Sequence, residues 1–179
     1  LDKNTLTELY SVPTAEMPFT CDGIEVSGDK AYIAVNNGFD FNALVGKVGV
    51  LDLPAGTLSQ TIDLGPDGLD PERIMLHGDE LYTFNNKDFN TSSISKVSIA
   101  GAEQGLVYTN NVAQNSSCGS SVLSADHIYY LEYSVGHLAR YDLATDAVVD
   151  TLQTSPMAYG LLDDPIDHVI YSTTTDYVD

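Results

Sequence analysis

Two near-copies of one unusual segment bring aromatic, carboxylate and amide side chains together. Residues 36–42 read NNGFDFN and residues 85–90 read NNKDFN. An aromatic ring offers a stacking face, and a nearby carboxylate or amide offers an orienting hydrogen bond. Asn-Asn at the end of a strand is also a common turn signal. The segments therefore predict either a repeated ligand site or a turn that the fold repeats.

Calcium is a second chemistry that these loops could support, because it prefers hard oxygen ligands. No EF-hand spacing is present, so calcium is a subordinate expectation, and no other cofactor is expected. The residues that would supply the oxygens are Asp40, Asn42, Asp88, Asn90, Asp176 and Asp179.

Catalytic and transition-metal signatures are missing from the sequence. The four histidines show no HExxH or paired spacing, so they predict no metal site. The serine-rich segment 115–121, NSSCGSS, has no G-x-S-x-G context and no nearby histidine. Cys21 and Cys118 permit one disulfide without requiring it. We therefore expect a protein that is not an enzyme.

Charge excludes one class of partner. The chain has 7 Lys and Arg against 26 Asp and Glu, a net charge of -19. So few cations cannot neutralise phosphates, and nucleic acid is not an expected partner. No apolar run approaches the length of a membrane helix, so no direct membrane insertion is expected. Leu1 opens directly into strand-like sequence, which we interpret as a chain that is mature, processed or incomplete at its start.

An internal repeat in the sequence predicts the strands that hold these loops. Short runs of Val, Ile, Tyr and Thr alternate with Gly, Asp, Asn and Pro, which is typical of antiparallel β structure. Four segments align on Asp29, Asp79, Asp126 and Asp167, spaced by about 40–50 residues. Repeats of that length with about four strands each predict the blades of a β-propeller, because each small sheet must stack on its neighbours.

The register divides the chain, taken as a single domain over 1–179, into blades. We expect blades at 22–65, 72–113 and 119–154, the first two strands of a further blade at 158–179, and the outer strand of a preceding blade within 1–13. The expected innermost strands cover 23–27, 73–76, 120–124 and 159–162. Three complete blades with partial blades at both ends do not close a ring. The rest is expected from the same chain or another chain, and a closed four-bladed ring is the alternative.

The connections on the two rims of such a propeller differ. The turns after the innermost and third strands are short and read SGDK, HGDE, SADH, LPAGT and LATDA, so they are structural. The opposite rim has the longer connections, where binding usually occurs. The residues expected to bind a ligand there are Asn37, Phe39, Asp40, Phe41, Asn86, Asp88, Phe89, Tyr133, Asp176 and Tyr177, with Arg73 and Tyr159 nearer the channel.

Residues 125–153, ADHIYYLEYSVGHLARYDLATDAVVDTLQ, carry a family resemblance. With the repeated x-Gly-Asp-x-x-Tyr pattern, they resemble the YncE-like, YVTN-type bacterial β-propellers. The resemblance implies a seven-bladed ring, a periplasmic or cell-surface location and non-catalytic binding. Some relatives are surface lipoproteins of gut bacteria that bind cobalamin over an outer-membrane transporter. No binding residue is carried over, because no motif here matches their sites.

The sequence thus leads to a non-enzymatic, extracytoplasmic ligand-binding propeller. Its partner would be a small molecule, cobalamin-like or another nutrient, or an outer-membrane or surface protein, bound on the long-loop rim. A protein-interaction scaffold with an acidic docking face is the alternative. A propeller lyase or hydrolase ranks third, since no set of histidines and acids converges on the channel.

Overall fold

The protein forms only β-strands, arranged as four sheets. A computed structural model describes residues 1–13, 17, 19–40, 42–87, 91–101, 104–113, 120–132, 135–154 and 158–174. None of these segments forms a helix with the length and apolar character needed to cross a bilayer. The prediction of an all-β chain built from four-stranded antiparallel blades is confirmed.

Each sheet is a meander in chain order. Blade 1 contains β1 (Cys21–Ser27), β2 (Lys30–Val35), β3 (Lys47–Asp52) and β4 (Thr57–Asp63). Blade 2 contains β5 (Pro71–His77), β6 (Glu80–Asn85), β7 (Ser92–Ser98) and β8 (Gly105–Ala113). Blade 3 contains β9 (Ser121–Ser124), β10 (His127–Glu132), β11 (His137–Asp142) and β12 (Ala147–Gln153). Blade 4 has two strands in the described part of the chain, β13 (Ala158–Asp164) and β14 (Val169–Thr174).

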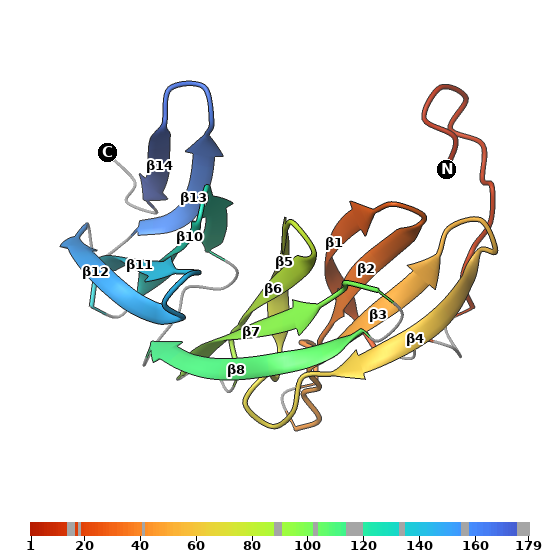
Figure 1. Cartoon of the computed structure of the whole chain (residues 1–179), viewed down its shortest axis with the longest axis horizontal. Helices are drawn as coiled ribbons and strands as arrows, with labels where there is room; N and C mark the ends of the chain where they lie inside the picture. The colour runs from red at the N-terminus through yellow and green to blue at the C-terminus, as the bar shows by residue number, and fades with distance from the viewer. Residues whose placement is uncertain are drawn as a thin grey trace.

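The blades are arranged in an open arc. Figure 1 shows β4, β8 and β12 along the outer side of the arc, and β1, β5 and β13 on its inner side. Blades 1 and 4 lie at opposite ends and do not meet (Figure 1). The inner strands β1 and β5 contact each other, as do β9 and β13. The first strands of successive blades therefore form one concave inner wall.

The short turns repeat in detail from blade to blade. Gly28, Gly78 and Ala125 each open a two-residue turn with a positive φ. The next residue, Asp29, Asp79 or Asp126, accepts a backbone hydrogen bond at its carbonyl from the residue that follows the third strand of the same blade. This bond ties the turn to the neighbouring strand, so the aligned aspartates mark a structural position.

The side chains of blade 2 alternate between its two faces and belong to two separate hydrophobic cores. Ile74, Leu81 and Val97 are buried against blade 1, whose Tyr32, Val48 and Val50 belong to the same cluster. Met75, Tyr82, Phe84 and Ile94 are buried on the other face, with Tyr130 and Tyr141 of blade 3. The Phe84 and Tyr130 rings lie 5.2 Å apart. Since side chains alternate along a strand, a single blade can hold both neighbours.

The outer strand predicted within residues 1–13 is not formed. The described residues there make a turn instead, in which the backbone N–H groups of Asn4 and Thr5 donate to Asp2 Oδ1, both at 2.9 Å. An outer strand needs the third strand of its own blade for its hydrogen bonds. No strand of the described structure pairs with this segment, so the segment forms no strand despite its β propensity.

Candidate functional site

The inner wall contains a hollow of about 360 Å³ lined by residues of β1, β5, β9 and β13. That volume lies within the usual range of small-molecule sites, roughly 300–1,000 Å³. Its apolar lining comes from Ile74, Met75, Leu76, Val122, Leu123, Leu161 and Leu162. Its polar lining consists of Glu25, Arg73 and Ser121. A few polar groups in an apolar concave wall are the usual composition of a ligand site.

Arg73 reaches this hollow through a repeated irregularity of the inner strands. The pairing of β5 with β6 shifts register between Pro71 and Arg73, and β1 and β13 shift at their own first residues. Such bulges commonly re-aim a side chain near a functional site. Arg73 therefore provides a guanidinium that can bind a carboxylate or phosphate with two hydrogen bonds.

Two further polar groups of the hollow are unusual for their burial. Burial raises the pKa of Glu25, so its carboxyl keeps a proton to a higher pH than usual. The Ser121 side chain is buried, and its Oγ makes no hydrogen bond within the described residues. A buried hydroxyl without a partner is costly unless something bound to it completes the hydrogen bond.

The segment NNGFDFN forms a hydrogen-bonded loop on the long-loop rim. Asn36 Oδ1 accepts from Thr20 Oγ1 at 2.8 Å and from the Gly38 N–H at 3.0 Å. Asn37 adopts a φ of 62° and donates from Nδ2 to the Ala43 carbonyl at 2.8 Å. The two asparagines therefore shape the loop, as the turn interpretation predicts.

The other described residues of this loop face outward. Asp40 accepts at Oδ1 from the Asn42 N–H at 3.1 Å, which is a local turn contact. Phe39 is 90% exposed. An aromatic ring with so little contact contributes little to the core, so Phe39 is available to a ligand or a partner.

The equivalent position in blade 2 is also held by hydrogen bonds. Asn86 is buried, and its Nδ2 donates to Glu72 Oε1 at 3.1 Å. Its backbone N–H donates to the carbonyl of Asp70 at 2.9 Å. Asn86 thus connects the end of β6 to the start of β5 and presents no free face.

Asp70 lies between the rim loops of blades 1 and 2, and no sequence motif singles it out. It is 1% exposed, and both of its carboxylate oxygens make no hydrogen bond within the described residues. Burial, with a smaller contribution from the negative charge of Asp22, raises its pKa to about 6. A perturbed carboxyl at a rim is a feature of functional sites as well as of structural ones.

The structure thus brings only some of the predicted binding residues together. Asn37, Phe39 and Asp40 share one loop, Asn86 lies on the same rim, and Arg73 lines the inner wall. Tyr159 is half-exposed at the start of β13 and is not among the residues lining the hollow; its carbonyl accepts a hydrogen bond from Ser120 Oγ. The remaining predicted residues lie outside the described part of the chain: Phe41, Asp88, Phe89, Tyr133, Asp176 and Tyr177.

Glu25, Ser121 and Asp70 were missed by the sequence analysis. Glu25 and Ser121 stand in innermost strands, where a polar residue facing the concave wall breaks the apolar pattern, and Asp70 stands just before β5. That signal was present in the sequence, but it does not distinguish a buried polar residue from an exposed one.

Three histidines make contacts with acids, each in a different place. His77 Nε2 lies 3.0 Å from Asp126 Oδ1, which joins blades 2 and 3. His127 and His137 contact Asp142 and Glu132 within their own blade. Over the described ranges, no three His, Cys, Asp or Glu side chains gather as a metal site. Cys21 is an exposed free thiol, and Cys118 lies outside the described residues.

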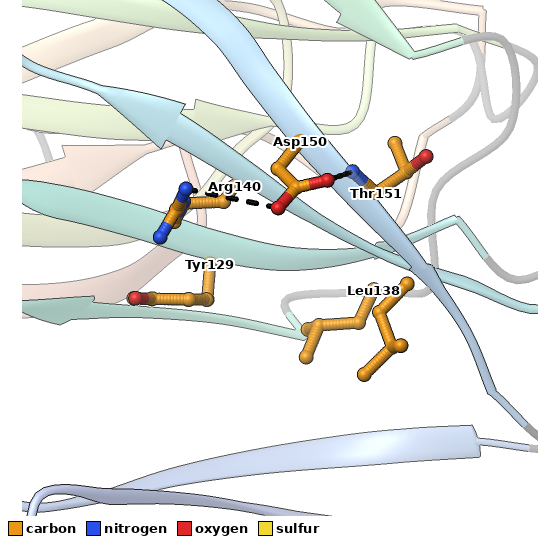
Figure 2. Close-up of a pocket in the computed structure, with 6 residues that line it drawn as sticks. Tyr129, Leu138, Arg140, Asp150 and Thr151 are labelled. Carbon is orange, nitrogen blue, oxygen red and sulfur yellow. Dashed lines mark hydrogen bonds and ion pairs between the residues drawn. The ribbon is translucent and has the colours of Figure 1, made fainter.

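A second hollow, of about 290 Å³, marks where blade 3 is left uncovered. Figure 2 draws the lining residues and labels Tyr129, Leu138, Arg140, Asp150 and Thr151; the unlabelled one is Leu152. Arg140 Nη2 lies 3.7 Å from Asp150 Oδ2, and the Thr151 N–H donates to Asp150 Oδ1 at 2.9 Å (Figure 2). Leu152 is 64% exposed. β13 packs on β9 and β10, so this surface is the part of the blade face beyond blade 4.

The comparisons with known proteins show the fold of this chain and assign it to no family. No family model matches the chain, and no curated protein matches it. Among solved structures, the designed protein Ika4 is similar, with a TM-score of 0.68, 12% identity and 96% of each chain covered. The Cps50 (Swd1) β-propeller domain of Myceliophteria thermophila has a TM-score of 0.61 and 13% identity, with 88% of this chain and 50% of that domain covered.

A third similar structure extends the same conclusion. Hydrazine synthase of Kuenenia stuttgartiensis has a TM-score of 0.60 and 14% identity, with 80% of this chain and 40% of that chain covered. This chain therefore spans half or less of the two natural proteins. Likeness at such low identity shows the fold alone, and the fold of this chain is a partial β-propeller.

Proposed function

We propose that the protein is a non-enzymatic propeller that binds a small molecule against its inner wall. The observation that carries this proposal is the hollow lined by Arg73, Glu25 and Ser121 among apolar side chains. Arg73 would bind an anionic group of the ligand, and the apolar side chains of the hollow would pack against its body. The ligand class is therefore an apolar-bodied molecule with a carboxylate or phosphate group.

The long-loop rim would extend this site toward solvent. Phe39 offers a stacking face there, and Asp40 offers an acceptor. The YncE-like resemblance implies that the ligand is cobalamin or another nutrient. A ligand as large as cobalamin would enter the hollow only in part, and the rest of it would lie on the rim. The same resemblance supports an extracytoplasmic location, in the periplasm or at the cell surface, and association with an outer-membrane or surface protein.

The ring would be completed by further blades from the same chain or another chain. Support comes from the apolar side chains left open at both ends of the arc. Ile24 of blade 1 is 60% exposed, and Leu152 of blade 3 and Leu162 of blade 4 are 64% and 65% exposed. Open apolar sheet faces of this kind are normally covered in a propeller.

Protein-observed NMR titration tests the proposed function. The probes are cobalamin and a set of aromatic carboxylates and phosphates. Shifts should cluster on β1, β5, β9 and β13, and Arg73→Ala should weaken binding about tenfold or more, the usual cost of losing a charge-assisted hydrogen bond. The matched control is Arg140→Ala, on the uncovered face of blade 3. Shifts confined to that face, or equal binding by both variants, would contradict the proposal.

A protein-interaction scaffold is the second candidate, and the net charge of -19 favours it. A basic partner would dock on the acidic surface through exposed charges. Salt separates the two functions, because screening weakens such docking steeply and hardly affects binding in an apolar hollow. Binding of a polylysine probe that survives high salt would count against the scaffold.

A further inference from the structure

Glu25 places a carboxylate in the apolar hollow of the inner wall. The side chain is half-buried and lines the hollow together with Arg73. It forms no hydrogen bond or ion pair with any residue that the structure describes. A carboxylate beside apolar side chains costs free energy unless a cation or a donor compensates it. The hollow therefore has an acidic position that a cationic group of a ligand can occupy.

Strand pairing fixes the direction in which Glu25 points. Glu25 is paired with Tyr32 of β2, and directly paired residues of antiparallel strands project from the same face of the sheet. Tyr32 belongs to the core shared by blades 1 and 2. The neighbours Ile24 and Val26 are exposed on the other face. Glu25 therefore points from blade 1 toward blade 2 and not toward the open end of the arc.

Arg73 approaches the same hollow from the other side of β5. It is paired with Phe84 of β6, which belongs to the core shared by blades 2 and 3. Arg73 and Glu25 form no ion pair with each other. Packed sheets lie about 10 Å apart, so charges held by successive blades are separated by roughly that distance. One ligand can therefore reach both charges only if its own charges are equally far apart.

The wall around these two charges is apolar. Ile74 and Leu76 of β5 line it, together with Leu123 of β9 and Leu161 of β13. An extended peptide chain rises by about 3.3–3.6 Å per residue, so three residues span about 10 Å. Such a peptide has an ammonium at one end and a carboxylate at the other, which complements an acid and a guanidinium held that far apart. Apolar side chains of the peptide would pack against the wall between them.

We propose that the inner wall binds a short zwitterionic peptide of about three apolar residues, with its ammonium at Glu25 and its carboxylate at Arg73. This inference rests on the proposed function, since it uses the same hollow and the same role of Arg73, and it adds the position that binds a cation. A single amino acid is too short to reach both charges, because its ammonium and carboxylate lie within one residue of each other. The net charge of -19 favours a ligand with an ammonium over one with anionic groups alone.

Calorimetric titration of the intact chain with the tripeptide Leu-Ala-Leu tests this inference. The same peptide is titrated with an acetylated N-terminus, which removes the ammonium, and with an amidated C-terminus, which removes the carboxylate. Acetylation should weaken binding about tenfold or more, the usual loss for a charge-assisted hydrogen bond. Amidation should weaken binding by a similar factor, because Arg73 loses its anion. Free leucine should bind more weakly than the tripeptide.

Two variants separate the Glu25 position from general attraction of amines to an acidic protein. Glu25→Gln keeps the size of the side chain and removes its charge, so it should bind the unmodified and the acetylated peptide equally. Asp22→Asn is the matched control, because Asp22 is an exposed carboxylate of the same strand that does not line the hollow. This control should prefer the unmodified peptide as strongly as the wild type does.

The outcomes distinguish this inference from the proposed function. Equal binding of the unmodified and acetylated peptides by the wild type would overturn the inference and leave the role of Arg73 intact. So would a preference for the unmodified peptide that survives in Glu25→Gln. Amidated peptide that binds as tightly as the free acid would contradict the proposed function instead. If no peptide binds, the inference fails, and the titration with aromatic carboxylates and phosphates decides the proposed function separately.

Discussion

Replacing Asp70 by Asn should stabilise the protein above neutral pH. Asn has the shape of a protonated Asp and carries no charge, so it removes the cost of burying an ionised carboxylate without creating a cavity. Asp70 has a φ of 55°. Asn tolerates that left-handed conformation about as well as Asp does, so the backbone should not change.

The magnitude follows from the pKa of Asp70, which burial and the charge of Asp22 raise from 3.8 to about 6. One pKa unit corresponds to about 1.36 kcal/mol, so the ionised form costs the fold up to about 3 kcal/mol. Because the folded pKa is the higher one, the folded state holds the proton more tightly. The wild type therefore keeps its full stability below pH 3.8 and loses this amount as the pH rises through about 6.

Urea unfolding of both proteins, from about pH 4 to pH 8 around these two pKa values, measures the effect. The difference in free energy of unfolding should be near zero at the acid end and approach about 3 kcal/mol above pH 6.5, a Tm difference of about 6–12 °C. Asp40→Asn, which removes an exposed carboxylate, should give a small difference that varies little with pH. A difference for Asp70→Asn that is absent, negative or independent of pH would refute the reasoning that this carboxylate is buried without partners.

Two other substitutions test the packing and the turns. Phe84→Ala should lower the free energy of unfolding by about 3–5 kcal/mol, because it empties a fully buried position against Tyr130. Phe39→Ala, at an exposed position, should change it by no more than about 0.5 kcal/mol. Equal effects of the two variants in urea unfolding would contradict the assigned burial. Ala125→Gly should raise the free energy of unfolding by about 1 kcal/mol, because Ala125 adopts a φ of 49° at the turn position where blades 1 and 2 have glycine. A lower urea midpoint for this variant would show that the left-handed conformation of Ala125 carries no strain.

The strands of this protein could be predicted because their signals are local. The segment KAYIAV at 30–35 alternates apolar residues and is bounded by Gly-Asp and Asn-Asn, and it forms β2. The segment at 5–12 forms no strand, because a strand also needs a partner strand for its hydrogen bonds, and no strand of the described structure pairs with it. Sequence periodicity indicates the tendency to be extended, and pairing decides whether a sheet forms.

The candidate sites were predicted only in part, for a similar reason. The loop at 36–42 was correctly placed on the long-loop rim, but its Asn36 and Asn37 turned out to be held by Thr20, Pro71 and Ala43. Arg73 was expected near the channel and lines the inner-wall hollow. Ser121 and Glu25 became candidates only once β1, β5 and β9 were seen to face the same space.

The sequence by itself determined the repeat, the strand order within each blade and the rim on which the long connections lie. These follow from periodicity and turn chemistry, which act between residues close in the chain. The tertiary structure decided which polar groups are buried, because burial requires blades to pack. Asp70 shows the difference: in the sequence it is one acid among 26. Its isolation arises where blade 2 meets residues 36, 38 and 45 of blade 1, which removes water from the carboxylate and leaves it without a donor.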